Sequence, residues 1–262
     1  MEKRIIFFDI DGTLLDEQTH TVPLSTKEAI KKAQINGHIC IVNTGRTITE
    51  INQTIKDLNF DGYICGCGTY IEYHQQEIFH HQLSNELKHK VIELSENCHM
   101  QTILEGKDIL AFPQYIYHPF LKSIKEDYKN EGFHMTTYQH NSLIDFDKFT
   151  SWYQENANVE MFKDELICDF DIIQRDIDFI EVVPKGYSKA TGIQYLIDYL
   201  GLSHEQTISI GDSMNDLSML TYTHESVAMG NSHPALFEIV TFCTKDIQNN
   251  GIEYALKNFH LI

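Results

Sequence analysis

A short apolar run near the start of the chain leads into two aspartates and a glycine. Ile5-Ile6-Phe7-Phe8 is followed directly by Asp9-Ile10-Asp11-Gly12-Thr13. Such a run is typical of a strand buried on both faces in a parallel sheet, and Gly12 is expected to end it. Open α/β sheets bind their ligands at the carboxyl ends of the strands. The sequence therefore predicts an α/β fold with Asp9 and Asp11 at its ligand-binding edge.

Two acids at a buried strand end need something to neutralise them. Burying charges without partners costs several kcal/mol, and a divalent cation would offset that cost. An ordinary strand end followed by an Asp-Gly turn is the alternative interpretation. This stretch by itself leaves both interpretations open.

Length and charge exclude several classes of protein. The 262 residues are near the size at which a single core stops growing, so one large domain or two smaller ones are expected. The formal net charge is −18 and the basic residues form no cluster, so we expect no nucleic-acid partner. No apolar run approaches the ~18 residues of a membrane span, and the first residues do not resemble a secretory signal. We therefore expect a cytoplasmic protein without membrane contact.

The cysteines are scattered along the chain. Cys65-Gly66-Cys67 lacks the two-residue spacer and the second pair of a zinc site. We expect reduced and mostly buried thiols at all six positions: Cys40, Cys65, Cys67, Cys98, Cys168 and Cys243.

Helix and strand signals alternate up to about residue 70. A capping box formed by Ser25 and Glu28 predicts a helix that runs to about Asn36, with Gly37 in the left-handed position beyond it. Strands are predicted over 38–42 and 63–65, with a helical stretch up to about residue 58 between them. This β-α-β-α-β order implies a parallel sheet with right-handed crossovers.

The pattern changes near residue 70 and returns at Ser188. Between these points we predict a hairpin over 70–73 and 78–82, helices over 87–98 and 120–130, and strands over 101–104, 108–112 and 178–183. After Ser188 we predict a helix from Lys189 to about 200, strands over 207–210, 227–229 and 240–243, and a closing helix over 251–258. Residues 1–82 and 185–262 are thus expected to form the parallel core, and residues 83–184 an inserted α+β domain.

Four polar motifs follow predicted strands or open a predicted helix. Taken alone, Thr44-Gly45 could be a simple turn, Arg46 a solvated residue and Lys189 a surface lysine. Packing offers the weakest explanation for the loop from Gly211 to Asp216, because three polar residues there follow an apolar strand. The four motifs are Asp9/Asp11, Thr44-Gly45-Arg46, Lys189 and Asp212/Asn215/Asp216.

In order and separation these motifs resemble those of the haloacid dehalogenase superfamily. More narrowly, the chain resembles the Cof-type phosphatases of class II, subgroup B, whose cap lies between the second and third motifs. The resemblance covers the whole chain. It implies a doubly wound parallel sheet, the Rossmann-like core of that superfamily, with an inserted α+β cap domain.

The resemblance also implies roles for the motif residues. Asp9 would be the nucleophile that forms an aspartyl-phosphate, and Asp11 the general acid and base. Mg²⁺ would be held by Asp9, the main-chain carbonyl of Asp11 and Asp212, with the Asp216 carboxylate behind these ligands. The phosphoryl oxygens would be bound by Lys189, Thr44, Gly45, Arg46 and Asn215.

The chain departs from the family pattern at three positions. Asn43 replaces a small residue, Cys67 stands where asparagine is common, and Ala190 replaces a glycine. None of these changes removes a group that the chemistry needs. Asn231 also fits the family, with a helix cap as the alternative interpretation.

The resulting hypothesis is a Mg²⁺-dependent phosphatase acting on small phosphorylated metabolites, either sugar phosphates or cofactor phosphates. The alternatives are a phosphomutase with the same aspartyl-phosphate chemistry and a non-catalytic phosphometabolite-binding protein. We expect a monomer or weak dimer in which the inserted domain acts as a lid. Four aromatic residues of that domain are candidates for substrate contact, with core packing as the favoured explanation for each: Tyr115, Tyr117, Phe120 and Trp152.

Overall fold

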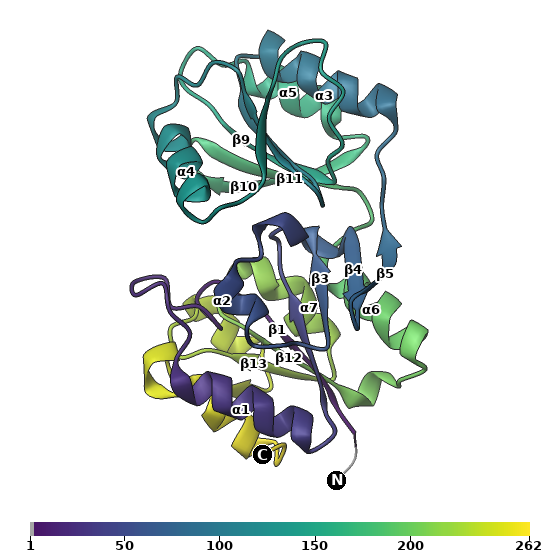
Figure 1. Ribbon diagram of the computed structural model, residues 1–262, viewed down its shortest axis with the longest axis vertical. Helices are drawn as coiled ribbons and strands as arrows, with labels where there is room; N and C mark the ends of the chain where they lie inside the picture. The colour runs from purple at the N-terminus through teal and green to yellow at the C-terminus, as the bar shows by residue number, and fades with distance from the viewer. Residues whose placement is uncertain (1–2) are drawn as a thin grey trace. The chain divides into compact units, whose positions relative to one another are not determined.

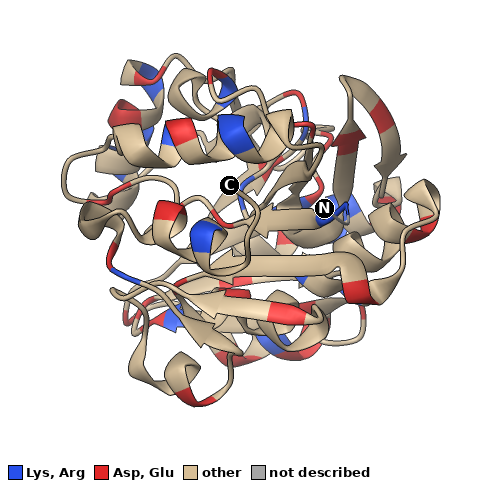
Figure 2. Cartoon of the chain, turned by 90° about the horizontal axis from the view of Figure 1, so that it is seen from below, with Lys and Arg blue, Asp and Glu red and all other residues tan. Residues whose placement is uncertain are grey.

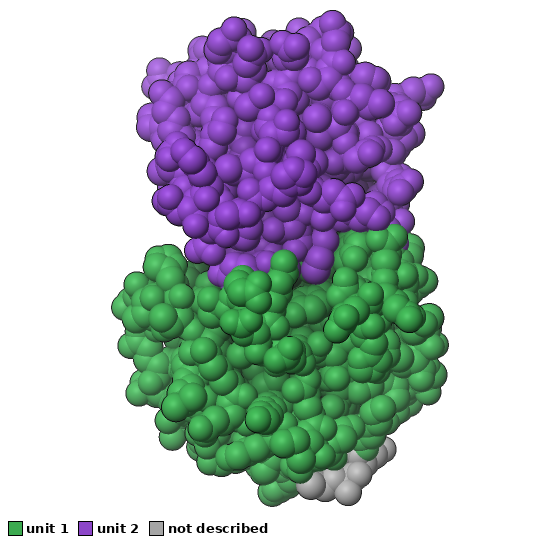
Figure 3. Space-filling model, in the orientation of Figure 1, with its two compact units in different colours: residues 1–45, 53–79, 188–262 green, residues 46–52, 80–187 purple. Residues whose placement is uncertain are grey.

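The structure, a computed structural model, describes residues 3–262 as two compact units. Unit 1 comprises the chain up to Gly45, Gln53–Phe79 and Ser188–Ile262, and unit 2 comprises Arg46–Asn52 and His80–Tyr187 (Figure 3). The prediction placed the inserted domain at 83–184. It also assigned residues 46–52 to the core, whereas these residues pack with unit 2.

Unit 1 is built on an eight-stranded sheet in the described part of the chain. β1 lies between β12 and β2, and the pairings from β14 to β3 are all parallel, whereas β4 is antiparallel to β3. Figure 1 shows β1 beside β12, with β13 beyond it. The strands in spatial order are β14 (Phe242–Cys243), β13 (Glu225–Ala228), β12 (Thr207–Gly211), β1 (Ile5–Phe8), β2 (Ile39–Asn43), β3 (Gly62–Cys65), β4 (Tyr70–Tyr73) and β5 (Gln76–His80).

Helices bury the centre of this sheet. All four side chains of β1 are fully buried, as expected for a parallel strand covered on both faces. Apolar residues of α6 and α7 pack in one cluster with Ile5 and Phe7, while α1 packs against α8. The helices of unit 1 are α1 (Leu24–Ile35), α2 (Gln53–Lys56), α6 (Lys189–Leu200), α7 (Leu217–Tyr222) and α8 (Gly251–Asn258). The doubly wound parallel α/β prediction is confirmed.

The predicted capping box at Ser25 is wrong. The helix α1 begins one residue earlier, at Leu24, and Pro23 occupies the N-cap position without a side-chain cap. Proline presets the backbone angle that suits a helix entry, so the helix needs no serine cap. The Ser25 hydroxyl instead donates to the Asn250 side chain, 2.8 Å away.

The helical stretch predicted to follow Arg46 is broken into two short pieces. A 3₁₀ turn covers Ile48–Glu50, and α2 covers only Gln53–Lys56. Within unit 2, the Glu50 carboxylate accepts a hydrogen bond from the Tyr128 hydroxyl at 2.8 Å, and the Thr49 hydroxyl donates to the Gly106 carbonyl at 2.9 Å. These bonds to distant partners explain why the segment leaves the helical path.

Unit 2 is an α+β structure with a six-stranded sheet in its described residues. The sheet is antiparallel except for the parallel pair β7 and β8. α3 (Asn85–Asn97) and α5 (Val159–Leu166) share one apolar cluster with the sheet, and α4 (Pro119–Asn130) shares another. The strands in spatial order are β10 (Phe170–Asp176), β11 (Phe179–Pro184), β9 (Lys148–Trp152), β6 (Gln101–Glu105), β7 (Leu110–Pro113) and β8 (Met135–Tyr138).

Four elements of unit 2 were not predicted: β8, β9, α5 and β10. β9 reads Lys-Phe-Thr-Ser-Trp, and all five residues are buried although three are polar. The strand therefore lacks the usual alternation of buried apolar and exposed polar residues. Its polar side chains Lys148 and Thr150 can be buried because both bond to Glu105 within the fold. The amino-acid pattern alone therefore hides a central strand.

The aromatic candidates of unit 2 divide between surface and core. Trp152 is buried and its ring stacks on Phe179. Tyr115, Tyr117 and Phe120 are exposed to 77%, 42% and 59%, so the expectation that they pack in the core is wrong for these three.

The surface has an acidic character without a basic stripe on its described elements. The chain has 38 acidic and 20 basic residues, and in Figure 2 the lysines and arginines are scattered over separate elements. Among residues 3–262, the helices are all too short or too polar to cross a membrane. All six cysteines are free; four are buried, and Cys168 and Cys243 are exposed.

Candidate active site

The candidate site lies where two neighbouring strands of unit 1 end. Asp9 follows β1 and Asp212 follows β12, and these strands are adjacent and parallel. The chain turns outward from β1 in both directions, to β2 on one side and to β12 on the other. Such a change of direction opens a ligand-binding crevice at the carboxyl ends of the strands. The topology thus brings Asp9 and Asp212 together across a long stretch of sequence.

Lys189 joins two of the carboxylates. It is the first residue of α6, and the Ser188 hydroxyl caps that helix by accepting from the Thr191 N–H. The Nζ of Lys189 lies 2.5 Å from Asp9 Oδ1 and 2.5 Å from Asp216 Oδ1. All three side chains are buried, so the ammonium is held in place by short, charge-assisted hydrogen bonds.

Asp216 also orders the loop that follows β12. Its Oδ2 accepts hydrogen bonds from the backbone N–H groups of Asp212, at 2.9 Å, and Ser213, at 3.0 Å. Both of its oxygens therefore have partners within the protein. This arrangement fits a carboxylate that supports the site from behind.

Two of the carboxylates, Asp9 and Asp212, resist ionisation. Burial, reinforced by Asp216, raises the pKa of Asp9 well above its usual range and raises the pKa of Asp212 to about 7. Burial works against the Lys189 ammonium, but Asp216 and Asp9 outweigh it and raise the pKa of Lys189. Lys189 supplies one positive charge beside three acids, so ionising all three would leave the cluster with an excess of negative charge.

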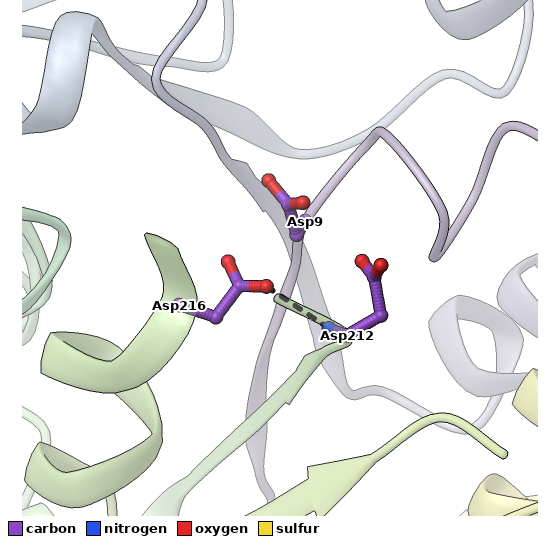
Figure 4. Close-up of side chains that lie close together, drawn as sticks. All are labelled: Asp9, Asp212 and Asp216. Carbon is purple, nitrogen blue, oxygen red and sulfur yellow. Dashed lines mark hydrogen bonds between the residues drawn. The ribbon is translucent and has the colours of Figure 1, made fainter. Parts of the chain in front are cut away.

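A divalent cation fits this cluster. Asp9, Asp212 and Asp216 each offer a carboxylate oxygen, and these oxygens lie within 4.8 Å of one another. Figure 4 shows the three side chains grouped together, with the bond from the Asp212 N–H to Asp216 as a dashed line. Carboxylate oxygens are the ligands that Mg²⁺ and Ca²⁺ prefer, and the cation would supply the missing positive charge. The three carboxylates are therefore suitable ligands for a hard divalent metal ion.

The turn after β1 packs tightly against Asp212. Gly12 has a φ of +73°, and a Cβ at this position would lie 2.2 Å from Asp212 Oδ2. The hydroxyl of the fully buried Thr13 donates to Asp212 Oδ1 at 2.9 Å. No role for Thr13 was predicted from the sequence. Its place two residues after Asp11 is the only sequence signal that could have suggested one.

We expect the Gly12→Ala variant to lose divalent-cation affinity, because the added methyl group must displace the Asp212 carboxylate. Gly37→Ala is a matched control: Gly37 also has a positive φ, +91°, but no atom lies within 4 Å of the added Cβ. A left-handed alanine costs about 1–2 kcal/mol, so both variants should be less stable in urea. Calorimetric titration with Mg²⁺ should show weaker binding only for Gly12→Ala. Equal affinities in the two variants would contradict the contact.

The other predicted site residues divide between the units. Thr44 is buried at the end of β2 in unit 1, where its N–H donates to Ile64 and its carbonyl accepts from Cys67. Gly45 is the last residue of that segment. Arg46 belongs to unit 2, and its guanidinium donates to the Glu50 carbonyl at 3.3 Å.

Asn215 and Asp11 lie in unit 1 and are both partly exposed. The Asn215 backbone N–H donates to the Ser213 hydroxyl at 3.3 Å. Asp11 forms an isolated bridge with Leu15 in the turn after β1. Among the predicted residues, Asp9, Lys189, Asp212 and Asp216 have side chains that lie close together at this site.

Comparisons with known proteins relate the chain to one family of hydrolases and to relatives named as phosphatases. Residues 6–256 match the family model of the haloacid dehalogenase-like hydrolases. The chain is 28% identical over 273 residues to YkrA of Bacillus subtilis (strain 168), and the match covers 100% of both chains. YkrA is named as a phosphatase by assignment. The chain is 23% identical over 274 residues to 5-amino-6-(5-phospho-D-ribitylamino)uracil phosphatase YitU of the same organism, with 97% of each chain covered.

A solved structure extends the similarity to the fold. The haloacid dehalogenase subclass IIB sugar phosphatase BT4131 superposes with a TM-score of 0.83 at 28% identity, covering 99% of this chain and 100% of that chain. Since these matches run over the full length of the relatives, they include the inserted unit as well as the parallel sheet.

Proposed function

Because this chain belongs to the haloacid dehalogenase-like hydrolase family and is a phosphatase, we propose that it is a Mg²⁺-dependent enzyme that hydrolyses small phosphorylated metabolites through an aspartyl-phosphate on Asp9. The observation that carries the proposal is the grouping of Asp9, Lys189, Asp212 and Asp216 at the carboxyl ends of β1 and β12. It combines a nucleophile, a fixed cation and a metal-binding donor set.

Asp9 and Asp11 divide the chemistry between them. A carboxylate oxygen of Asp9 attacks phosphorus while the bond from phosphorus to the ester oxygen breaks, and Asp11 gives a proton to the departing alcohol. Asp11 then removes a proton from water, which attacks the aspartyl-phosphate, releases inorganic phosphate and regenerates Asp9. Asp11 is suited to exchange protons with bound molecules because it is partly exposed, unlike Asp9.

Asp9, the main-chain carbonyl of Asp11 and Asp212 would hold the metal ion, with Asp216 behind them. The ion supplies positive charge that lets an acidic site accept a phosphate dianion. Lys189 would bind the transferring phosphoryl oxygens as well as the Asp9 carboxylate. Hydrogen bonds from Thr44, the Gly45 N–H and Asn215 would complete the part of the phosphate site that unit 1 provides.

The inserted unit is the part of the chain that we propose reads the substrate. Lids of this kind exclude water and contact the leaving group. The names of two relatives support a small phosphorylated substrate, since one is named a sugar phosphatase and the other a 5-amino-6-(5-phospho-D-ribitylamino)uracil phosphatase. We therefore propose sugar phosphates or cofactor phosphates as substrates.

Chelation tests the role of the metal. We expect EDTA to abolish phosphate release from para-nitrophenyl phosphate, and added Mg²⁺ to restore it, because three carboxylates without a cation would repel the dianion. Phosphate release is measured before chelation, in EDTA, and after Mg²⁺ is returned. Full activity in EDTA would contradict the proposal.

A panel of about a hundred phosphorylated metabolites, the scale that a reaction-class hypothesis requires, would then test the substrate class. Release of inorganic phosphate from a sugar phosphate or cofactor phosphate supports hydrolysis. Isomer formation without phosphate release would instead show a phosphomutase.

A further inference from the structure

The turn that carries Asp11 is tied to a distant part of unit 1. Within the turn, the Ile10 carbonyl accepts hydrogen bonds from the N–H groups of Thr13, Leu14 and Leu15, and the Gly12 N–H donates to Leu15. The Gly12 carbonyl has a partner outside this turn. That carbonyl accepts a hydrogen bond from Asn231 Nδ2 at 2.8 Å.

Asn231 links this turn to the segment before α8. Its Oδ1 accepts a hydrogen bond from the Ile247 N–H at 3.0 Å, so both ends of the amide are used. Asn231 does not cap the following 3₁₀ turn Pro234–Glu238, because His233 holds the N-cap position there. The helix-cap interpretation is therefore wrong, and the side chain instead bridges two backbone segments.

The Gly12 carbonyl belongs to the peptide group that joins Gly12 to Thr13. Fixing this peptide holds Gly12 on one side and Thr13 on the other; Asp11 is the residue directly before Gly12, and the Thr13 hydroxyl holds Asp212. We infer that Asn231 is a positioning residue for the proposed reaction: its hydrogen bond to the Gly12 carbonyl aligns Asp11 for proton transfer to the leaving group. This inference rests on the proposed function.

A second link between the same parts of the chain provides the control. The Ser25 hydroxyl donates to Asn250 Oδ1 at 2.8 Å, well beyond the turn that carries Asp11. Because the Ser25 bond has the same length but lies farther along the chain from Asp11, Ser25→Ala removes a comparable link without touching the Gly12 carbonyl.

The leaving group provides a measurement that a merely structural residue would not affect. The phosphate ester of an alcohol needs a proton from Asp11 as its bond breaks, whereas para-nitrophenolate leaves readily without one. The ratio kcat/KM covers the steps up to the aspartyl-phosphate. Misaligning Asp11 should therefore lower kcat/KM for a sugar phosphate more than for para-nitrophenyl phosphate.

The experiment compares wild type, Asn231→Ala, Asn231→Asp and Ser25→Ala on para-nitrophenyl phosphate and on the sugar phosphate that the wild type hydrolyses fastest. We expect both Asn231 variants to lose about 10–100-fold in kcat/KM on the sugar phosphate, the loss that a small misplacement of a reacting group causes, and only a few-fold on para-nitrophenyl phosphate. Ser25→Ala should stay near wild type on both. Asn231 is exposed, so the variants should fold, with a Tm lower by about 2–4 °C.

Asn231→Asp distinguishes the effect of the bond to the Gly12 carbonyl from the effect of the bond to the Ile247 N–H. It keeps an acceptor for the Ile247 N–H but loses the donor to Gly12 while the carboxylate is ionised. Its kcat/KM relative to wild type should therefore rise as the pH falls and the new carboxyl group regains a proton to donate, whereas Asn231→Ala should show no such recovery.

Equal losses on the two substrates, or no loss at all, would overturn the inference while leaving the proposed function intact. A wild type that hydrolyses neither substrate in Mg²⁺ would instead overturn the proposed function.

Discussion

Asp9→Asn is expected to lower kcat by about 10⁴–10⁶-fold, the range seen when one member of a catalytic unit is removed. An amide oxygen is a far weaker nucleophile than a carboxylate, and its attack on phosphorus would not give a stable acyl phosphate. The fold should remain intact, because Asn matches Asp in shape and Lys189 keeps its bond to Asp216. Initial rates in saturating substrate and Mg²⁺ give the size of the loss.

Thermal unfolding of Asp9→Asn tests whether the loss of activity leaves the fold intact. Burial raises the pKa of Asp9, so the charged carboxylate is costly in the folded state. Removing that charge should leave Tm in metal-free buffer unchanged or higher. Asp198→Asn, an exposed substitution on the same helix as Lys189, is the matched control and should keep full activity. Wild-type turnover in Asp9→Asn would remove Asp9 as the nucleophile.

Lys189→Met should reduce both stability and activity. The methionine leaves Asp9 and Asp216 buried without their shared cation, and breaking a buried ion pair in this way costs about 3–5 kcal/mol. Loss of the fixed charge at the phosphoryl group should also lower the rate by at least about 10²–10³-fold. Urea unfolding in metal-free buffer and initial rates in Mg²⁺ measure the two effects.

The stability loss in Lys189→Met should depend on pH. Without the ammonium, the folded-state pKa of Asp9 rises further above its unfolded value of about 3.8. The folded variant then binds more protons than the unfolded chain, so its stability falls as the pH rises above that value. Burial already raises the pKa of Asp9 in the wild type, so both proteins lose stability in parallel at first. The difference should widen once the pH exceeds the folded-state pKa of Asp9 in the wild type. Lys185→Met, at an exposed position, should show neither the loss nor the pH dependence. A pH-independent difference would contradict the assignment of the loss to these carboxylates.

Most of the parallel core could be predicted because its signals are local. The apolar run of β1, the glycine after α1 and the serine before α6 all act within a few residues of their own position. The inserted unit was harder to predict, since its strand β9 owes its burial to polar side chains that find partners on other strands. Ser25 misled the prediction for a similar reason: its hydroxyl bonds to Asn250 instead of capping a helix.

The candidate site was predictable as a set of residues but not as a geometry. Asp9, Lys189 and Asp212 each follow a strand or open a helix, and this order along the chain already indicates phosphoryl chemistry by family resemblance. The sequence had no means of showing that Arg46 packs with unit 2, or that Thr13 and Asn231 support the turn after β1.

The sequence by itself determined the α/β order, the inserted α+β segment and the acidic residues at the strand ends, because hydrophobic period and turn residues report on nearby backbone. Only the tertiary structure decided that one lysine serves both Asp9, 180 positions away, and Asp216, 27 positions away. Such a pairing depends on which strands become neighbours. That choice is made by the packing of the whole sheet and its helices, and it brings the first strand beside β12, the strand that Asp212 follows.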